Sequence, residues 1–491
     1  MSTEYPLTGL TGLPSWQSVP SPRGGPDTDT TSRVAARQLE RRRPTVGCVV
    51  PAYNEAVSIA GVLDSMLSQT RRPDAIHVIV NNTTDDTARI AAWYAGAHEM
   101  LVDGERVITE IHVHDLGTMD DKKVGALNYG FRLVDGMDYL LGIDGDTSAD
   151  PYAVQQLIEE MESDPTIGGI SAIYSIDDSA LDGIKEKFLI CGQRAQFSSF
   201  NMRNLLNDRQ MAVLGGQLSI FSMEALHAVT SAGHQIQPWL TVSEVEDSLL
   251  SLQIQSAGYK TMISATARAN VGGMDTFRAL DAQQVKWNYG CIDLMWPGVR
   301  DGHRGQPFHP NLRIRWLDNF SMLFNGITRV GFAILLTCAL MFHAFVFSWW
   351  WVVPPVIGYL LNIRIAHSMA KVTRRDYLFA LLFFPAEFYT WVRLGHFVRA
   401  WSQFFFAEAK DNWAAQAKAE SGKSSLPMWL VPFGVTTVFY TSCVLVFDQV
   451  LSAVVKSNVL WVGWRALGAI TVIQTLAMLI PLLRPHRGLK A

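Results

Sequence analysis

The chain has 491 residues, of which 48% are hydrophobic, and its mean hydropathy is +0.12. It is too apolar for a typical soluble enzyme and too long for one small domain. The net charge of -4 and a pI near 6.3 argue against a nucleic-acid binder, which usually has a strongly basic face. The five cysteines are widely spaced and contain no CxxC pair, so neither a zinc site nor a disulfide framework is predicted.

The first 45 residues differ in composition from the rest of the chain. They are rich in Pro, Gly, Ser and Thr and lack the apolar run of a signal peptide. This composition predicts a disordered tail at residues 1–45, because such a segment buries too little apolar surface to fold. The basic cluster at 41–43 either contacts anionic lipid headgroups or belongs to a solvated linker.

Between residues 46 and 275, short runs rich in β-branched residues alternate with helix-like segments. This alternation predicts an α/β domain whose parallel-rich sheet is covered by helices. The four clearest predicted strands are Val46 to Val50, Ile76 to Val80, Ile108 to Val113 and Tyr139 to Ile143. The chain has no GxGxxG or Walker-type loop, which disfavours classical dinucleotide and P-loop chemistry. The alternating His112 and His114 are only a weak indication of a metal pair.

Polar clusters follow three of these predicted strands, at 51–55, 81–87 and 144–147. Ligands of parallel sheets bind beyond the carboxyl ends of the strands, so the three clusters predict one shared site. Asp144 and Asp146 are one residue apart and suit a divalent cation held against a diphosphate. The same DGD triplet on its own would also fit an ordinary turn.

Residues 329–491 are predicted to form an α-helical transmembrane domain. Long uncharged runs predict four spans, at about 330–347, 349–366, 427–447 and 462–483. The three tryptophans at 349–351 mark the turn of the first pair, because tryptophan prefers the membrane interface. The positive charges that flank both pairs predict two hairpins with their ends in the cytosol.

Two further segments are predicted to meet the membrane without crossing it. Region 276–328 is predicted to be amphipathic and interfacial, with a helix over Asp275 to Trp296. Segment 377–400 is interrupted by charges and a proline, and is predicted to lie on the membrane surface or to re-enter it. A fifth span at this segment is the main alternative.

The motifs, in their order along the chain, resemble those of inverting family 2 glycosyltransferases. The closest likeness is to the membrane-embedded, processive polysaccharide synthases, which make polymers such as poly-N-acetylglucosamine, chitin, hyaluronan and cellulose. The matching motifs are PAYNE at 51–55, NNTTDDT at 81–87, KVGALN at 123–128, DGD at 144–146, VED at 245–247 and QQVKW at 283–287. This resemblance implies a Rossmann-like glycosyltransferase A-type domain followed by transmembrane helices.

The resemblance also implies a role for each motif residue. Asp144 and Asp146 would bind Mn²⁺ or Mg²⁺, Asp247 would be the general base, and Glu246 would orient the acceptor or support its helix. The nucleotide sugar would be bound by Ala52, Tyr53, Glu55, Asn81, Lys123, Asp144, Gln283 and Lys286. The acceptor sugar would contact Trp287, Gly216 and Gln217.

Simpler interpretations exist for some of these residues. Two acids at a helix start also complement the helix dipole, and a tryptophan near a membrane is often an interface anchor. Three positions depart from the family pattern. Asn81 stands where an aspartate commonly contacts uracil, Val245 replaces the threonine of TED, and Lys286 replaces an arginine and so loses its bidentate grip on phosphate.

The sequence thus predicts a metal-dependent, inverting polysaccharide synthase of the plasma membrane with a cytosolic catalytic domain. Its donor is predicted to be UDP-N-acetylglucosamine first and UDP-glucose second, its acceptor a glycan, and no nucleic acid is involved. One alternative is a non-processive enzyme that adds one sugar to a lipid or short glycan. Another is a catalytically silent glycan-binding or export subunit. Four spans are few for a channel in a monomer, which favours either the non-processive enzyme or a homo-oligomer.

Overall fold

The computed structural model describes residues 43–406 and 431–491, except 103, 178–182 and 301–302. Residues 1–42 of the predicted tail therefore lie outside the described residues. The same holds for residues 427–430 of the predicted span 427–447. Every element discussed below lies within the unit Thr45–Ala491.

Four parallel strands form the centre of a mixed sheet, and they confirm the four predicted strands. They are β1 (Val46–Ala52), β2 (Ala75–Val80), β4 (Glu105–Asp115) and β5 (Tyr139–Ile143). The other strands are β3 (Gly96–Val102), β6 (Thr147–Ala149), β7 (Ile167–Ile176), β8 (Leu218–Ser222) and β9 (Lys260–Val271). The order across the sheet is β3-β4-β2-β1-β5-β8-β7-β9-β6. The sheet is parallel-rich at β1, β2, β4 and β5, and β8 pairs antiparallel with both of its neighbours.

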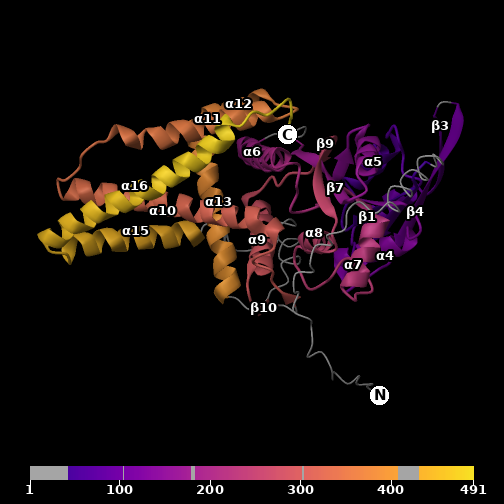
Figure 1. Ribbon diagram of the computed structural model, residues 1–491, viewed down its shortest axis with the longest axis horizontal. Helices are drawn as coiled ribbons and strands as arrows, with labels where there is room; N and C mark the ends of the chain where they lie inside the picture. Colours follow the sequence, from indigo (N-terminus) through magenta and orange to yellow (C-terminus); the bar gives the residue numbers. More distant parts are fainter. Residues whose placement is uncertain (1–42, 103, 178–182, 301–302, 407–430) are drawn as a thin grey trace, which may run out of the picture. The chain divides into compact units, whose positions relative to one another are not determined.

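Helices cover both faces of this sheet (Figure 1). Cys48 and Val50 of β1 pack into a cluster with α2 (Ile59–Leu67) and α5 (Ala153–Ser163). Val49, between them, belongs to a second cluster with α4 (Lys122–Leu133), α7 (Met223–Ala232) and α8 (Glu246–Ser256). Successive side chains of a strand point to opposite faces, so a strand covered on both sides must be continuously apolar. All seven residues of β1 are buried, as this requires.

A layer of long helices follows the sheet domain. The predicted helix at 275–296 is confirmed as α9 (Phe277–Met295), which packs along α13 (Phe383–Phe406) through a cluster that includes Tyr289 and Phe404. Asp281 of α9 also forms an ion pair with Arg399 of α13. The predicted interfacial segment 377–400 is split between α12 (Arg374–Leu381) and α13. Its position relative to a membrane remains a prediction.

Within the described residues, three helices are long and apolar enough to cross a membrane. They are the run Pro310–Met341, which comprises η1 (Pro310–Leu312) and α10 (Arg313–Met341), then α15 (Val431–Gln449) and α16 (Ala453–Leu483). Figure 1 shows α10 running alongside α15 and α16, while α13 crosses their direction. The predicted span 349–366 corresponds to η2 (Trp349–Trp351) and α11 (Val353–Ser368), a helix of 16 residues. The number of crossings stays a prediction.

The helix boundaries show why the first and the last of these spans were predicted to begin too late. Helix α10 begins at Arg313, well before the predicted start at 330, and α16 begins at Ala453 rather than 462. Charged residues end an uncharged run without ending a helix, because arginine and lysine are good helix formers. Arg329 directly precedes the predicted start of the first span at 330. It instead lies within α10 and pairs with Glu387 of α13. A short hairpin of β10 (Val299–Arg300) and β11 (His303–Arg304) precedes α10.

The contact between α4 and β1 yields a matched pair of glycine substitutions. A Cβ at Gly130 would lie 2.3 Å from Cγ1 of Val49, whereas a Cβ at Gly61 of α2 would meet nothing within 4 Å. We expect Gly130→Ala to lower the free energy of unfolding by about 1–3 kcal/mol, because stiff Val49 cannot yield. Gly61→Ala should raise it by about 0.5–1 kcal/mol. Thermal unfolding of the purified proteins in detergent measures both, and shifts in the same direction would contradict this packing.

Candidate active site

An ion pair between α4 and the end of β5 lies at the centre of the site. Nζ of Lys123 is 2.7 Å from Oδ1 of Asp144 and 3.9 Å from Oε1 of Glu246. Lys123 is the second residue of α4, Asp144 directly follows β5, and Glu246 opens α8. Three elements that are far apart in the sequence therefore converge at the carboxyl edge of the parallel strands, where the sequence predicted a shared site.

The segment 215–217 covers this ion pair. Ile143 at the end of β5 pairs with Leu218 at the start of β8, so Gly216 lies just beyond the sheet beside Asp144. A Cβ at Gly216 would lie 2.7 Å from Nζ of Lys123 and 2.8 Å from Oδ1 of Asp144. This close approach explains the glycine better than a turn does, since its φ is not positive. Beside it, Oε1 of Gln217 is buried and has no hydrogen-bond partner among the described residues.

Helix α8 brings two more carboxyl groups into the cluster. Oδ2 of Asp247 accepts a hydrogen bond of 2.9 Å from the backbone N–H of Gly216. Burial, and then the nearby Glu246, raise the pKa of Asp247 to about 8, against the opposing effects of Lys123 and of this hydrogen bond. Ser251, one turn later, donates to the carbonyl of Asp247 and accepts from the backbone of Leu214. The acids thus complement the helix dipole and also face the site.

Asp146 completes a group of four carboxyl groups around Lys123. Burial and then the charge of Asp144 raise the pKa of Asp146 to about 6. Burial by itself would lower the pKa of Lys123, but Asp144, Asp247 and Glu246 raise it above its ordinary value. The lysine is therefore held charged, and negative charge still exceeds the charge that Lys123 supplies.

This donor set fits a divalent cation bound only in part by protein. Two carboxylates at Asp144 and Asp146 are hard oxygen ligands, and a cation bound there is usually completed by substrate phosphates and water. Within the described part of the chain, no group of three or more His, Cys, Asp or Glu side chains is arranged so that it could hold a metal ion by itself. Lys123, 2.7 Å from Asp144, would stand beside the same phosphates.

The predicted nucleotide residues at β1 and β2 form the adjoining part of the edge. The carbonyl of Ala52 accepts from the N–H of Asn81, and the N–H of Glu55 donates to Thr87. Asn81 is buried, and its Nδ2 donates to Asn82 and to the carbonyl of Lys122. Tyr53 is exposed. The side-chain NH₂ group of Asn81 therefore holds the loop after β2 to the first residue of α4.

A glycine joins this part of the edge to the carboxylates. A Cβ at Gly145 would lie 2.8 Å from Cγ of Glu55, so the DGD triplet packs directly against the PAYNE loop. Two of the three predicted polar clusters are thus in contact, and Asn81 connects the third through the backbone of Ala52. The structure brings together the clusters as the strand pattern predicted.

The QQVKW residues lie on α9, next to the carboxylate cluster. A Cβ at Gly290 of α9 would lie 2.6 Å from Val245, the residue before Glu246. Lys286 is buried, whereas Gln283 and Trp287 are partly exposed. Packing therefore joins α9 to the start of α8.

Sequence reasoning missed an aromatic series between Trp287 and the carboxylates. The ring of Trp287 meets Phe197 edge-on at 6.2 Å, and Phe197 meets Tyr174 at 6.1 Å. The hydroxyl oxygen of Tyr174 would be 3.1 Å from a Cβ at Gly215, and burial, with the charge of Asp247, raises the Tyr174 pKa to about 12. Neither residue stands in a recognised motif, so only the fold could show them.

The role of Asn128, the last residue of KVGALN, was also missed. Its Nδ2 donates to the carbonyl of Trp239, and its Oδ1 accepts from the N–H of the same residue. This reciprocal pair fixes the segment that leads to VED, at 245–247. The amide therefore positions the candidate base by way of the backbone.

The histidine pair belongs to a different part of the sheet. His77 of β2 stacks on His112 of β4, and Nδ1 of His77 is 3.2 Å from Nε2 of His114. Burial and the two neighbouring histidines lower the pKa of His77 to about 4. A surface cavity of about 770 Å³ adjoins His112 and His114 between β4 and α3 (Thr87–Ala92).

The raised pKa of Asp247 generates a prediction about stability. Its carboxyl holds a proton more tightly in the folded protein than in the unfolded chain, where its pKa is about 3.9. The stability that it contributes is therefore full below about pH 4 and is lost as pH rises through about 8. Without added cation or nucleotide, we expect Asp247→Asn to unfold at a higher temperature than the unsubstituted protein at pH 9. The difference should shrink at pH 5.

Differential scanning fluorimetry at the two pH values tests this expectation. For a chain of this length, each kcal/mol of added stability should raise the midpoint by about 1 °C. Asp164→Asn, at an exposed carboxyl group paired with Lys260, is the control. A difference no larger at pH 9 than at pH 5 would contradict the burial of an ionised Asp247.

Comparison with known proteins agrees with this geometry. Residues 48–230 match the model of the protein family described as "Glycosyl transferase family 2". A poly-beta-1,6-N-acetyl-D-glucosamine synthase of Staphylococcus epidermidis is 22% identical over 304 residues, which are 60% of this chain and 64% of that protein. The enzyme of the same name from Staphylococcus aureus is 21% identical over 251 residues, 50% and 54% of the two chains. The alignments thus span less than two thirds of these relatives.

The chain also aligns with solved structures. A mannosyltransferase from Pyrobaculum calidifontis aligns over 91% of this chain and 94% of its own, with 16% identity and a TM-score of 0.40. That score is too low for an argument about either fold or chemistry. The family match covers β1 to α7, which includes Lys123, Asp144 and Gly216, and α8 with its two acids follows directly. The chain therefore contains a segment, residues 48–230, that is similar to family 2 glycosyltransferases, and apolar helices follow this segment.

Proposed function

We propose that this glycosyltransferase extends a β-linked glycan from a UDP-sugar at the membrane, with inversion at the anomeric carbon. UDP-N-acetylglucosamine is the first proposed donor, and UDP-glucose the second. The observation that carries the proposal is the group of four carboxyl groups around Lys123 at the carboxyl edge of the sheet. The names of the staphylococcal relatives support a hexosamine donor.

The proposed chemistry divides the cluster into two functions. Asp144 and Asp146 would hold Mn²⁺ or Mg²⁺, which supplies positive charge to the diphosphate of the leaving group. Lys123 would stabilise the same negative charge by direct contact with phosphate oxygens. Lys286 and Gln283 on α9 are proposed to approach the diphosphate from the acceptor side when substrate is bound.

Asp247 is proposed to be the general base on the acceptor side. The acceptor hydroxyl oxygen attacks the anomeric carbon from the face opposite the diphosphate, and its proton passes to Asp247. The bond from the anomeric carbon to the phosphate oxygen breaks, and UDP leaves with the electron pair. A carboxyl group with a pKa of about 8 is a stronger base than an ordinary aspartate, which suits the removal of a hydroxyl proton.

The rest of the chain is proposed to place this reaction at a membrane. Three helices long and apolar enough to cross a bilayer support an integral membrane protein. The positive flanks of the predicted spans support a plasma-membrane enzyme with a cytosolic catalytic domain. Translocation of the product between these helices, and assembly into a homo-oligomer, remain part of the proposal.

Two alternative functions predict different products. A non-processive transferase would add one sugar to a lipid or short glycan and leave no ladder on a gel. A silent binding or export subunit would release no nucleotide. The intact set of Lys123, Asp144, Asp146 and Asp247 favours an enzyme over the silent subunit.

The proposal is tested with purified full-length protein in lipid nanodiscs. With Mn²⁺ and glycan primer, UDP-N-acetylglucosamine should give more UDP release than UDP-glucose, GDP-mannose or UDP-galactose, and a ladder of products. No nucleotide release from any donor in the presence of either cation would refute the enzyme. Release with a single added sugar would instead support the non-processive alternative.

Two substitutions test the assignment of roles. Asp247→Asn should reduce sugar transfer about 10²–10⁴-fold, because the amide cannot accept the proton. Asp146→Ala should reduce transfer strongly and weaken the response to added Mn²⁺, because one oxygen ligand is lost. Asp164→Asn should transfer at the unsubstituted rate. Turnover above a tenth of that rate in Asp247→Asn would remove this residue from the role of base.

A further inference from the structure

Helix α6 (Ile184–Leu206) contacts two groups of elements around its circumference. Arg194 and Ser198 face the connection between α11 and α12, Gly192 and Gln196 face α9 and α13, and Phe197 faces Trp287. Positions 194 and 198 are four apart, as are 192 and 196, so each pair lies on one side of the helix. None of the sequence motifs named above lies on α6.

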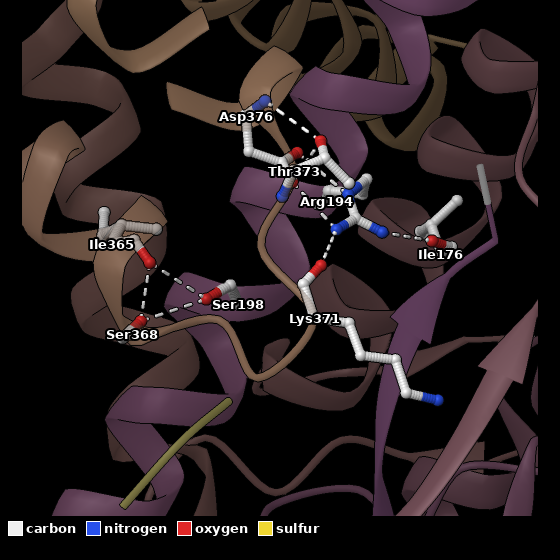
Figure 2. A network of polar contacts seen from close by, with 8 residues as sticks. All are labelled: Ile176, Arg194, Ser198, Ile365, Ser368, Lys371, Thr373 and Asp376. Carbon is white, nitrogen blue, oxygen red and sulfur yellow. Dashed lines mark hydrogen bonds and ion pairs between the residues drawn. The ribbon is translucent and has the colours of Figure 1, made fainter. Parts of the chain in front are cut away.

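Arg194 makes an unusually complete set of contacts with the connection after α11 (Figure 2). Its Nε and Nη2 each donate to one carboxylate oxygen of Asp376 at 2.9 Å, which is a bidentate pair. Nη2 also donates to the carbonyl of Lys371 at 2.6 Å, and Nη1 donates to the carbonyl of Ile176 on β7 at 2.9 Å. The side chain of Arg194 is 7% exposed and that of Asp376 is fully buried.

Asp376 is in turn fixed by the start of α12. Its Oδ2 accepts hydrogen bonds from the N–H and the hydroxyl of Thr373, while its own N–H donates to the Thr373 hydroxyl, a capping box. One turn along α6, Ser198 contacts the hydroxyl of Ser368 at 3.2 Å and the carbonyl of Ile365 at 3.4 Å (Figure 2). The last turn of α11 and the first turn of α12 are therefore both held to α6.

The opposite side of α6 holds the acceptor side of the site. Gln196 donates to Oε1 of Gln284, within QQVKW, and accepts from the hydroxyl of Tyr389 on α13. A Cβ at Gly192 would lie 2.3 Å from the ring of Tyr389, so the two helices are in close contact. Phe197 meets the edge of Trp287. Movement of α6 would therefore displace Trp287 relative to Asp247.

We propose that Arg194 and Asp376 are positioning residues that fix α6, and with it Trp287, against the α11–α12 connection so that the acceptor hydroxyl meets the donor. The inference rests on the proposed function. The contact between Arg194 and Asp376 would thereby determine which of two nucleophiles attacks the donor sugar. With the acceptor in place, its hydroxyl oxygen attacks the anomeric carbon. With the acceptor misplaced, a water oxygen attacks the anomeric carbon instead and its proton passes to Asp247. The bond from the anomeric carbon to the phosphate oxygen breaks, so the products are free sugar and UDP.

The geometry favours positioning over simple stabilisation. A buried ion pair contributes little net stability, because the desolvation of both charges offsets their attraction. A planar guanidinium with two carboxylate bonds and two carbonyl bonds nevertheless permits one orientation, which a flexible contact would not. A displacement of the order of 1 Å at a reacting group can cost about 100-fold in rate.

The experiment compares Arg194→Gln, Asp376→Asn and the double variant in nanodiscs. The measured quantity is sugar transferred to primer divided by UDP released, together with free sugar and the unfolding temperature. We expect each single variant to lower this ratio about 10-fold or more while UDP release continues and free sugar accumulates. The double variant should recover thermal stability, because no unpaired charge is left buried, yet keep the low ratio. Lys260→Gln, at an exposed ion pair with Asp164, is the control and should change nothing.

Three results would overturn the inference. They are an unchanged ratio in both single variants, a parallel loss of transfer and UDP release, and a ratio that recovers together with stability in the double variant. If a single variant does not fold, the double variant, which buries no unpaired charge, decides. Failure of the proposed function is distinct, since the unsubstituted protein would then release no UDP and yield neither glycan nor free sugar.

Discussion

Repulsion among four carboxyl groups at one edge of the sheet is the constraint on which this structure depends. Asp144 and Asp146 follow β5, and Glu246 and Asp247 begin α8, so the fold itself brings the acids together. Burial strengthens their repulsion and raises the pKa values of Asp146 and Asp247 to about 6 and about 8. Lys123 offsets part of this charge. An arrangement that costs stability is expected where a cationic ligand and a reacting proton will be bound.

The neighbouring elements keep this cluster compact from two sides. On the donor side, Gly145 and Gly216 allow the backbone to approach where any side chain would collide with Glu55, Lys123 or Asp144. On the acceptor side, α9 packs against Val245 and α13, and the aromatic series reaches from Trp287 to Tyr174. The carboxylate cluster is therefore packed between the loops of the sheet and helices that adjoin the apolar segments.

Much of the sheet domain could be predicted from sequence because its signals are local. Continuous apolar runs predicted β1, β2, β4 and β5, and the rule that ligands bind at their carboxyl ends predicted that PAYNE and DGD would meet. The antiparallel strand β8 and the approach of Gly216 to Asp144 depend on pairing between residues far apart in the sequence, such as Ile143 and Leu218. No local pattern in a single sequence contains that information.

The helical part was harder to predict, for a physical reason. The ends of the spans were predicted at charged residues. Arg329 nevertheless lies inside α10, where Glu387 on α13 neutralises its charge. Similarly, Arg194 looks like an ordinary helix charge until Asp376 is found beside it, 182 positions later. Buried charges are explained by their partners, and partners distant in sequence become visible only in the fold.

The most direct test of the central claim is a titration with Mn²⁺ followed by electron paramagnetic resonance, with and without UDP. If the carboxylate cluster is half of a cation site that a diphosphate completes, UDP should tighten Mn²⁺ binding about 10-fold or more, and Mn²⁺ should tighten UDP binding equally. Replacing Asp144 and Asp146 with asparagine should abolish this reciprocal effect. Equal binding of Mn²⁺ with and without UDP, or an unchanged effect in that variant, would contradict the account.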